Sequence, residues 1–171
     1  ATLIFNRSNA LTYTGVVSGS GSLTQAGAGT LTITGANTYT GGTTISSGAL
    51  QIGSGGTTGV VSGNIIDDAS LIFNRSNALN YAGNVSGTGS LTKAGAGTLI
   101  LTGANTYTGG TTISAGAVQI GSGGTVGSVV GDIVNNGSLI FNRSEPDFKR
   151  TKLGPCIIWG EGRGSGRWGG G

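Results

Sequence analysis

The sequence has no histidine, a single cysteine and only 9% charged residues. Without histidine, neither a Ser-His-Asp nor a Cys-His catalytic mechanism can be assembled within the chain. The usual zinc sites, built from histidine and cysteine, are excluded too, and we expect no metal and no cofactor. The lone cysteine, Cys156, cannot form an intrachain disulfide.

The few charges nearly cancel over most of the chain. The formal net charge is +3, but residues 1–144 contribute only +1, from the cations Arg7, Arg75, Lys93 and Arg143 and the anions Asp67, Asp68 and Asp132. Because no basic stripe is present, we expect no binding to nucleic acid or acidic lipid. No run approaches the roughly 20 apolar residues of a membrane helix. No basic segment followed by an apolar run opens the chain, so we expect neither membrane insertion nor a signal peptide within these residues.

What the chain has in abundance is glycine, 37 of 171 residues, arranged in an internal repeat. Residues 3–70 and 71–138 are identical at 51 of 68 positions, and a third copy begins at residue 139 and stops after residue 144. A unit that recurs end to end cannot bury its apolar face alone, so it stacks on its neighbour. We therefore expect a repeat architecture over residues 1–144.

Strand patterns alternate with glycine-rich turns inside each copy. Residues 30–34 alternate polar and apolar, which places Leu31 and Ile33 inside and the threonines outside, and Leu50 and Ile52 do the same around Gln51. No segment has the spacing of an amphipathic helix. These patterns predict strands and turns throughout.

Apolar positions recur at about the length of a solenoid coil: Ile45 lies 22 residues after Leu23, and Leu71 lies 21 after Leu50. We predict an all-β parallel β-helix with about three coils per 68-residue repeat. A local alternative is an antiparallel hairpin at Gly41-Gly42. Substitutions between copies keep apolar positions apolar at Leu50/Val118 and Ile33/Leu101 and polar positions polar at Thr12/Asn80, with Thr32/Ile100 as an exception on the outer face. By this rule Gln25 and its counterpart Lys93 belong to the polar, outward-facing set.

The segments from Leu23 to Gly53 and from Leu91 to Gly121 are nearly identical, and both contain GANTYTGGTT, at Gly35–Thr44 and Gly103–Thr112. They resemble the autotransporter-associated β-strand repeat, also called the passenger-associated transport repeat. This resemblance implies a right-handed parallel β-helix in the exported passenger of a large bacterial surface protein. It also implies an extracellular or outer-membrane surface location.

A change of composition follows Ser144, where both prolines, both tryptophans and the cysteine occur. We predict a β-helix over 1–144 and a separate, irregular tail over 145–171, which is a linker, a different domain or the product of a shifted reading frame. Both ends of the repeat region cut through a copy, so we interpret it as an uncapped fragment. Exposed strand edges then predict end-to-end self-association.

Few residues are candidates for chemistry. Asp67 and Asp68 are adjacent carboxylates, but the second copy has Asn135 and Asn136 there, which favours a polar turn. Three repeat-region aspartates cannot fill several calcium sites. An ice-binding threonine array is disfavoured because the pattern is broken in the second copy. Asn6-Arg7-Ser8 and Asn74-Arg75-Ser76 match the N-glycosylation pattern, which we interpret as chance.

Tyr39 and Tyr107 lie beside Gly-Gly turns and are the candidate ligand contacts, because exposed aromatic rings can stack on sugars. The alternative, which the sequence favours, is that each ring supplies packing area. We predict a structural stalk or spacer segment of a surface-displayed passenger. The second hypothesis is an adhesin that binds host or matrix glycans, or a protein surface ligand. A polysaccharide-degrading enzyme is a weaker third, for want of a carboxylate cluster.

Overall fold

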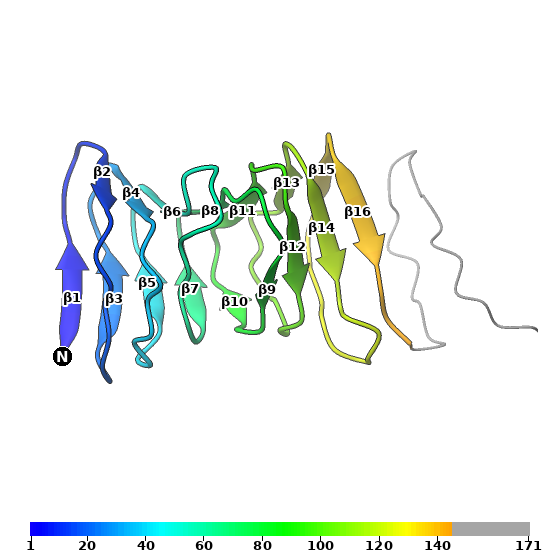
Figure 1. Cartoon of the computed structure of the whole chain (residues 1–171), viewed down its shortest axis with the longest axis horizontal. Coiled ribbons are helices and arrows are strands. Elements are labelled where there is room, and N and C mark those ends of the chain that lie inside the picture. The colour runs from blue at the N-terminus through cyan, green and yellow to red at the C-terminus, as the bar shows by residue number, and fades with distance from the viewer. Residues whose placement is uncertain (145–171) are drawn as a thin grey trace, which may run out of the picture.

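The computed structural model describes residues 1–144, which form strands and turns without a helix. Sixteen strands lie in three sheets along an elongated molecule (Figure 1). The first sheet contains β1 (Thr2–Phe5), β3 (Ser22–Gln25), β5 (Thr43–Ile45), β7 (Ile65–Asp67) and β10 (Val85–Ser86). The second contains β2 (Leu11–Tyr13), β4 (Thr30–Ile33), β6 (Ala49–Ile52), β8 (Ser70–Phe73), β11 (Ser90–Lys93), β13 (Thr111–Ile113) and β15 (Ile133–Asn135). The third contains β9 (Leu79–Tyr81), β12 (Thr98–Leu101), β14 (Ala117–Ile120) and β16 (Ser138–Phe141).

The strands pair in parallel across successive turns of a solenoid. Along the second sheet, Leu11, Leu31, Leu50 and Leu71 are successive partners and Thr111 pairs with Ile133, so one turn takes 19 to 22 residues. The second sheet has seven strands, one from each turn. The predicted parallel β-solenoid is therefore confirmed. The hairpin alternative is wrong, because β4 and β5, which flank Gly41-Gly42, belong to different sheets.

Alternate side chains of each strand point into the solenoid. Leu31 is 2% exposed and Ile33 0%, whereas the threonines beside them in β4 are half-buried. Leu23, Ile45, Leu50 and Ile52 are completely buried, as the sequence predicts. Each such side chain contributes about 1.5–3 kcal/mol through burial of apolar surface. Because each inward residue stacks on its counterpart in the next turn, the core runs the length of the stack.

The 68-residue repeat is longer than three turns. Three turns along the first sheet lead from Leu3 through Leu23 and Thr43 to Ile65. The counterpart of Leu3, Leu71, lies six residues later in the second sheet, and the third counterpart, Leu139, lies in the third sheet. Each copy thus advances three and a third turns and moves to the next side of the solenoid. The predicted value of about three coils is refined accordingly.

The repeated string GANTYTGGTT forms buried polar contacts between turns. Asn37 is 1% exposed, and its Oδ1 accepts a hydrogen bond of 2.8 Å from the Val17 amide of the preceding turn. Its Nδ2 donates to the carbonyls of Gly35 and Val60, at 3.1 and 2.9 Å. Asn105 repeats these contacts with the Val85 amide and with the carbonyls of Gly103 and Ser128. The string therefore supplies hydrogen bonds where a side of the solenoid has little strand structure.

The predicted domain boundary lies at the edge of the described residues. β16 opens the third copy and ends at Phe141, three residues before the last residue of the predicted β-helix, Ser144. The tail predicted for 145–171 lies outside the described residues, so its irregular structure stays a prediction.

Candidate functional site

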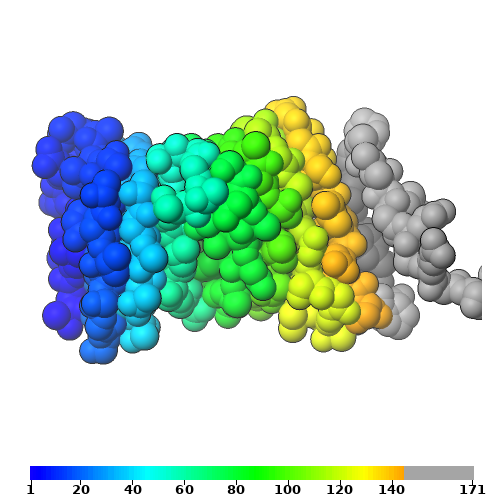
Figure 2. All heavy atoms as spheres, viewed as in Figure 1, coloured from blue at the N-terminus to red at the C-terminus, as the bar shows by residue number. Residues whose placement is uncertain are grey.

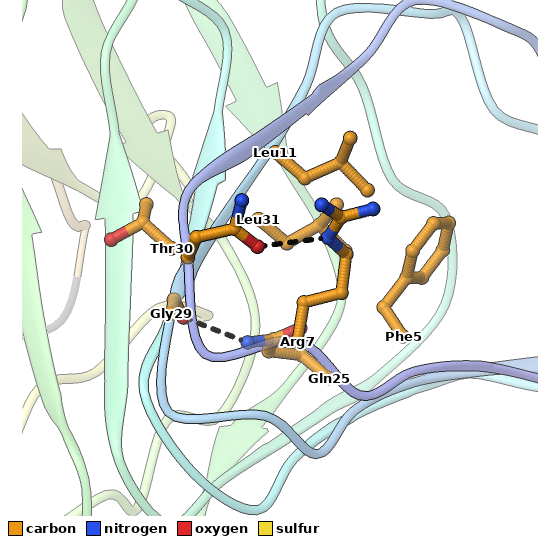
Figure 3. A pocket seen from close by; sticks show the side chains of 8 residues that line it. Phe5, Arg7, Leu11, Gln25, Gly29, Thr30 and Leu31 are labelled. Carbon is orange, nitrogen blue, oxygen red and sulfur yellow. Dashed lines mark hydrogen bonds between the residues drawn. The ribbon is translucent and has the colours of Figure 1, made fainter.

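A hollow of about 300 Å³ lies at the first turn and is lined by residues 1–3, residues 17–22 and Tyr39. The face in Figure 2 is a continuous stack of turns without a large hollow. A cavity of about 10 Å³ lies between the first two turns, lined by Phe5, Arg7, Asn9, Leu11, Gln25, Gly29, Thr30 and Leu31 (Figure 3). This volume holds about one water molecule. Within residues 1–144 there is no group of three or more His, Cys, Asp or Glu side chains that could hold a metal ion.

The two candidate ligand-contact tyrosines lie inside the solenoid. Tyr39 and Tyr107 are 0% exposed. Their hydroxyls share hydrogen bonds of 2.6 Å with the hydroxyls of Thr43 and Thr111. Burial raises the pKa of Tyr39 and raises that of Tyr107 to about 12. A ring without an exposed face cannot stack on a sugar, so the structure favours the packing interpretation for both residues.

The adjacent carboxylates point to opposite sides of the chain. Asp67 is 0% exposed, whereas Asp68 is exposed and accepts a hydrogen bond of 3.2 Å from the Thr88 amide. The Asp67 Oδ1 accepts a hydrogen bond of 3.1 Å from the Ala69 amide, but Oδ2 has no hydrogen-bond partner among the described residues. Burial raises the Asp67 pKa to about 6. Because they face different environments, these two carboxylates do not form the cooperating pair of a glycoside-cleaving site.

Two polar side chains predicted to face outward are inside. Gln25 is 2% exposed and Lys93 1% exposed, and each ends a strand whose other inward residue is a leucine. The Gln25 amide donates to the carbonyls of Gly27 and Gly29, both at 2.9 Å. The Lys93 ammonium donates to the Gly95 carbonyl, and burial lowers the Lys93 pKa. The outward prediction was wrong because carbonyls of the glycine-rich turn satisfy these groups inside.

The arginine of the second and of the third LIFNRS string makes a contact that sequence reasoning missed. The Arg75 guanidinium is 7% exposed and donates to the carbonyls of Gly59 and Thr57, in the loop that follows β6. Its neighbours join the same loop: the Asn74 carbonyl accepts from the Gly55 amide and the Ser76 amide donates to the Gly56 carbonyl, both at 2.9 Å. The segment Asn74–Ser76, which we call a strap, therefore ties two turns together.

The strap of the next copy repeats this arrangement. Arg143 donates to the carbonyls of Gly127 and Thr125, at 2.7 and 2.6 Å. The Asn142 carbonyl accepts from the Gly123 amide at 2.8 Å, and the Ser144 amide donates to the Gly124 carbonyl at 3.1 Å. The signal in the sequence is the recurrence of an arginine every 68 residues with no matching carboxylate nearby. The strap also gives Asn-Arg-Ser a structural explanation that needs no glycan.

The outer threonine rows are discontinuous. On the second sheet, Thr12 pairs with Thr32, but the next outward residues are Gln51 and Ile72. This agrees with the prediction that no regular ice-binding array is present.

Comparison with known proteins identifies the repeated segments. The model of the passenger-associated transport repeat matches residues 23–52 and 91–120. The chain carries two passenger-associated transport repeats. It is also 45% identical over 140 residues to the "Adhesin BmaC autotransporter" of Brucella suis biovar 1 (strain 1330). That match covers 82% of this chain but 4% of the relative. No solved structure gives a significant match.

Each passenger-associated transport repeat corresponds to a defined part of the solenoid. The first spans β3 to β6 and the second β11 to β14, so the second is turned by one side of the solenoid relative to the first. The strap Asn74–Ser76 and the loop it binds both lie between the two matched segments. The straps therefore belong to the connecting segment. No helix that could cross a membrane occurs in the described part of the chain.

Proposed function

We propose that this chain is a structural stalk or spacer segment of an autotransporter-type passenger displayed outside a bacterial cell. The observation that carries the proposal is the continuity of the core: the second sheet runs through all seven turns with stacked inward residues. Such a stack gains length with each added repeat. The repeat match and the autotransporter relative support the extracellular location.

A non-enzymatic role fits the placement of the acidic side chains. Of the two adjacent carboxylates, Asp67 is enclosed in the core and Asp68 faces solvent. The relative is named an adhesin, which is not an enzyme name. We infer that the segment supports export and display and does not cleave a polysaccharide.

Adhesion is the second candidate function, favoured by the relative's name and by apolar side chains on the outer surface. Ile4, Ile66 and Val134 are 59%, 48% and 55% exposed, at positions where outward threonines occur in other turns. Ile66, next to Thr44 on the outer row of the first sheet, is the residue that a protein or glycan ligand would contact there.

The purified 171-residue chain, applied to a glycan array and to immobilised matrix proteins, distinguishes the two functions. The spacer proposal expects no saturable binding. Saturable binding that is weakened by Ile66→Thr, with an unchanged melting temperature, would contradict the spacer role and support adhesion. Thr44→Ser, on the same outer row, is the matched control because it alters the surface without removing an apolar group.

A further inference from the structure

Three Asn-Arg-Ser straps occur in the described chain: Asn74–Ser76 is engaged on both sides, and Asn142–Ser144 is engaged on its upstream side. On the downstream side, the Arg75 carbonyl accepts a hydrogen bond of 2.9 Å from the Gly97 amide of the following turn. On the upstream side, Asn74–Ser76 and Asn142–Ser144 bind the preceding glycine-rich loops. The first strap, Asn6–Ser8, has the same downstream contact, 2.9 Å from the Gly29 amide to the Arg7 carbonyl. No described residue contacts its upstream side as these loops contact the other straps.

The Arg7 side chain already has the orientation that the other straps use. Its Nε donates to the Asn9 Oδ1 at 3.0 Å, the same bond and distance as between Arg75 and Asn77. Arg7 is exposed, whereas Arg75 is 7% exposed beneath its loop. In Figure 3 the guanidinium of Arg7 lies between Gln25 and Leu11, at the rim of the small cavity. Pre-orientation by Asn9 lowers the entropy lost when a loop binds.

We propose that the Asn6–Ser8 strap is a docking site for a glycine-rich loop of the Gly53–Gly59 kind, occupied when a repeat turn in the same polypeptide stacks on the first turn. The two terminal nitrogens of Arg7 donate to two loop carbonyls two residues apart. The Asn6 carbonyl and the Ser8 amide pair with the loop backbone. The ligand is a surface of backbone carbonyl and amide groups, and its own side chains need no charge.

The two occupied sites define which loops fit. Both loops begin Gly-Ser-Gly-Gly-Thr, and a Cβ on Gly53 or Gly121 would lie 2.8 Å from the Cγ of Arg75 or Arg143. A side chain at this position would push the arginine away, and the positive φ there, 83° and 80°, also favours glycine. The planar guanidinium fork reaches two acceptors in fixed geometry, which a lysine ammonium cannot do. The site thus selects a glycine-first loop with two carbonyls directed at the arginine.

The test adds a copy of residues 49–68 directly before Ala1, which reproduces the spacing between the loop and the strap at Arg75. Hydrogen exchange followed by mass spectrometry measures protection of the added loop. We expect its amides to exchange at least about tenfold more slowly in the extended chain than in the same chain with Arg7→Ala. The Arg7→Lys variant should lose most of this protection, because a single ammonium group does not replace the two terminal nitrogens of the guanidinium. Arg75→Ala in the unextended chain should release the Gly53–Gly59 loop to a similar degree.

Three results would overturn the proposal. In the first, hydrogen exchange of the added loop does not change with Arg7→Ala, although exchange of the Gly53–Gly59 loop does change with Arg75→Ala. Another is a Gly53–Gly59 loop that does not depend on Arg75, which would remove the straps as binding elements. The third is Arg7-dependent protection of the first turn that rises with concentration in the unextended chain, which would make a second copy the occupant.

Discussion

At the residue scale, the most unusual group is the Asp67 carboxylate, enclosed in the core with one oxygen unpartnered among the described residues. Its pKa is raised to about 6, mainly by burial, with a smaller contribution from Asp68. A carboxyl whose folded pKa exceeds its unfolded value favours the fold in its protonated form. That stability is fully present below about pH 4 and is lost as the pH rises to about 6.

Asp67→Asn should therefore remove a pH dependence of the free energy of unfolding. In the parent chain this contribution is up to about 3 kcal/mol, from a pKa shift of about two units. The variant should show a flatter stability curve between pH 4 and pH 7, measured by urea denaturation. Asn135, at the same position of the second copy, shows that the repeat accepts an amide there. The exposed Asp132→Asn is the control, and an unchanged curve for Asp67→Asn would contradict this explanation.

Asn105→Ala should be strongly destabilising. It would leave the Val85 amide and the Ser128 carbonyl without their partner and would remove one of the two donors to the Gly103 carbonyl. Each buried group left unsatisfied costs about 1–3 kcal/mol, so a loss of about 3 kcal/mol or more is expected. Thermal melting measures it, with the exposed Asn80→Ala as control. Equal melting temperatures for the two variants would show that these bonds contribute little.

Alternation of polar and apolar residues was sufficient to predict the core at Leu31, Ile33, Leu50 and Ile52. The prediction failed at Gln25 and Lys93 because it assigned them to the outside by their polarity alone. The strand period of two in fact places them on the inner side, two residues after Leu23 and Leu91. The sequence favoured packing for Tyr39 and Tyr107, but only the tertiary structure places both rings completely inside, since a residue beside a turn can face either way.

At the element scale, the repeat length and the turn length are separate quantities. The 68-residue identity was visible in the sequence, but the turn length varies, as the steps from Leu31 to Leu50 and from Leu50 to Leu71 show. The three sides of the solenoid accept the same strands, so a repeat need not complete a whole turn. The straps were not predicted because the loop that each arginine binds lies in the preceding turn. Which loop lies there depends on the length of that turn, which the repeat length does not give.

Deleting Leu71–Ser138 should shorten the solenoid without changing its fold. Ser70 would join Leu139, which restores the sequence Ser-Leu-Ile-Phe of β8 in the second sheet. The product loses three and a third turns, about 16 Å at roughly 4.8 Å between strands. Its melting temperature should fall because interfaces between neighbouring turns are lost.

Deleting Leu71–Ala104 is the mismatched control. This removes half as many residues, among them Val85 and Gly103, to which Asn105 is hydrogen-bonded. Circular dichroism should show β structure in the first variant and its loss after residue 70 in the second. If both variants keep their β structure equally, the 68-residue repeat is not the unit that preserves register.

At the scale of the whole molecule, the chain is a stack of turns. The number of repeats determines its length, and the number of residues in a turn determines its width. The core has the same three-sided plan from β1 to β16, and each turn contacts its neighbours through parallel pairing. Stability should then increase with each repeat while the cross-section stays constant. This behaviour is what a spacer between a cell surface and a distal domain requires.

The most direct test of the spacer account is small-angle X-ray scattering of chains that carry one, two and three additional copies of Leu71–Ser138, inserted after Ser138. The account predicts that the maximum dimension rises by about 16 Å per copy, with an unchanged cross-sectional radius of gyration. A cross-section that widens with each copy, or a maximum dimension that does not grow in proportion to copy number, would contradict it.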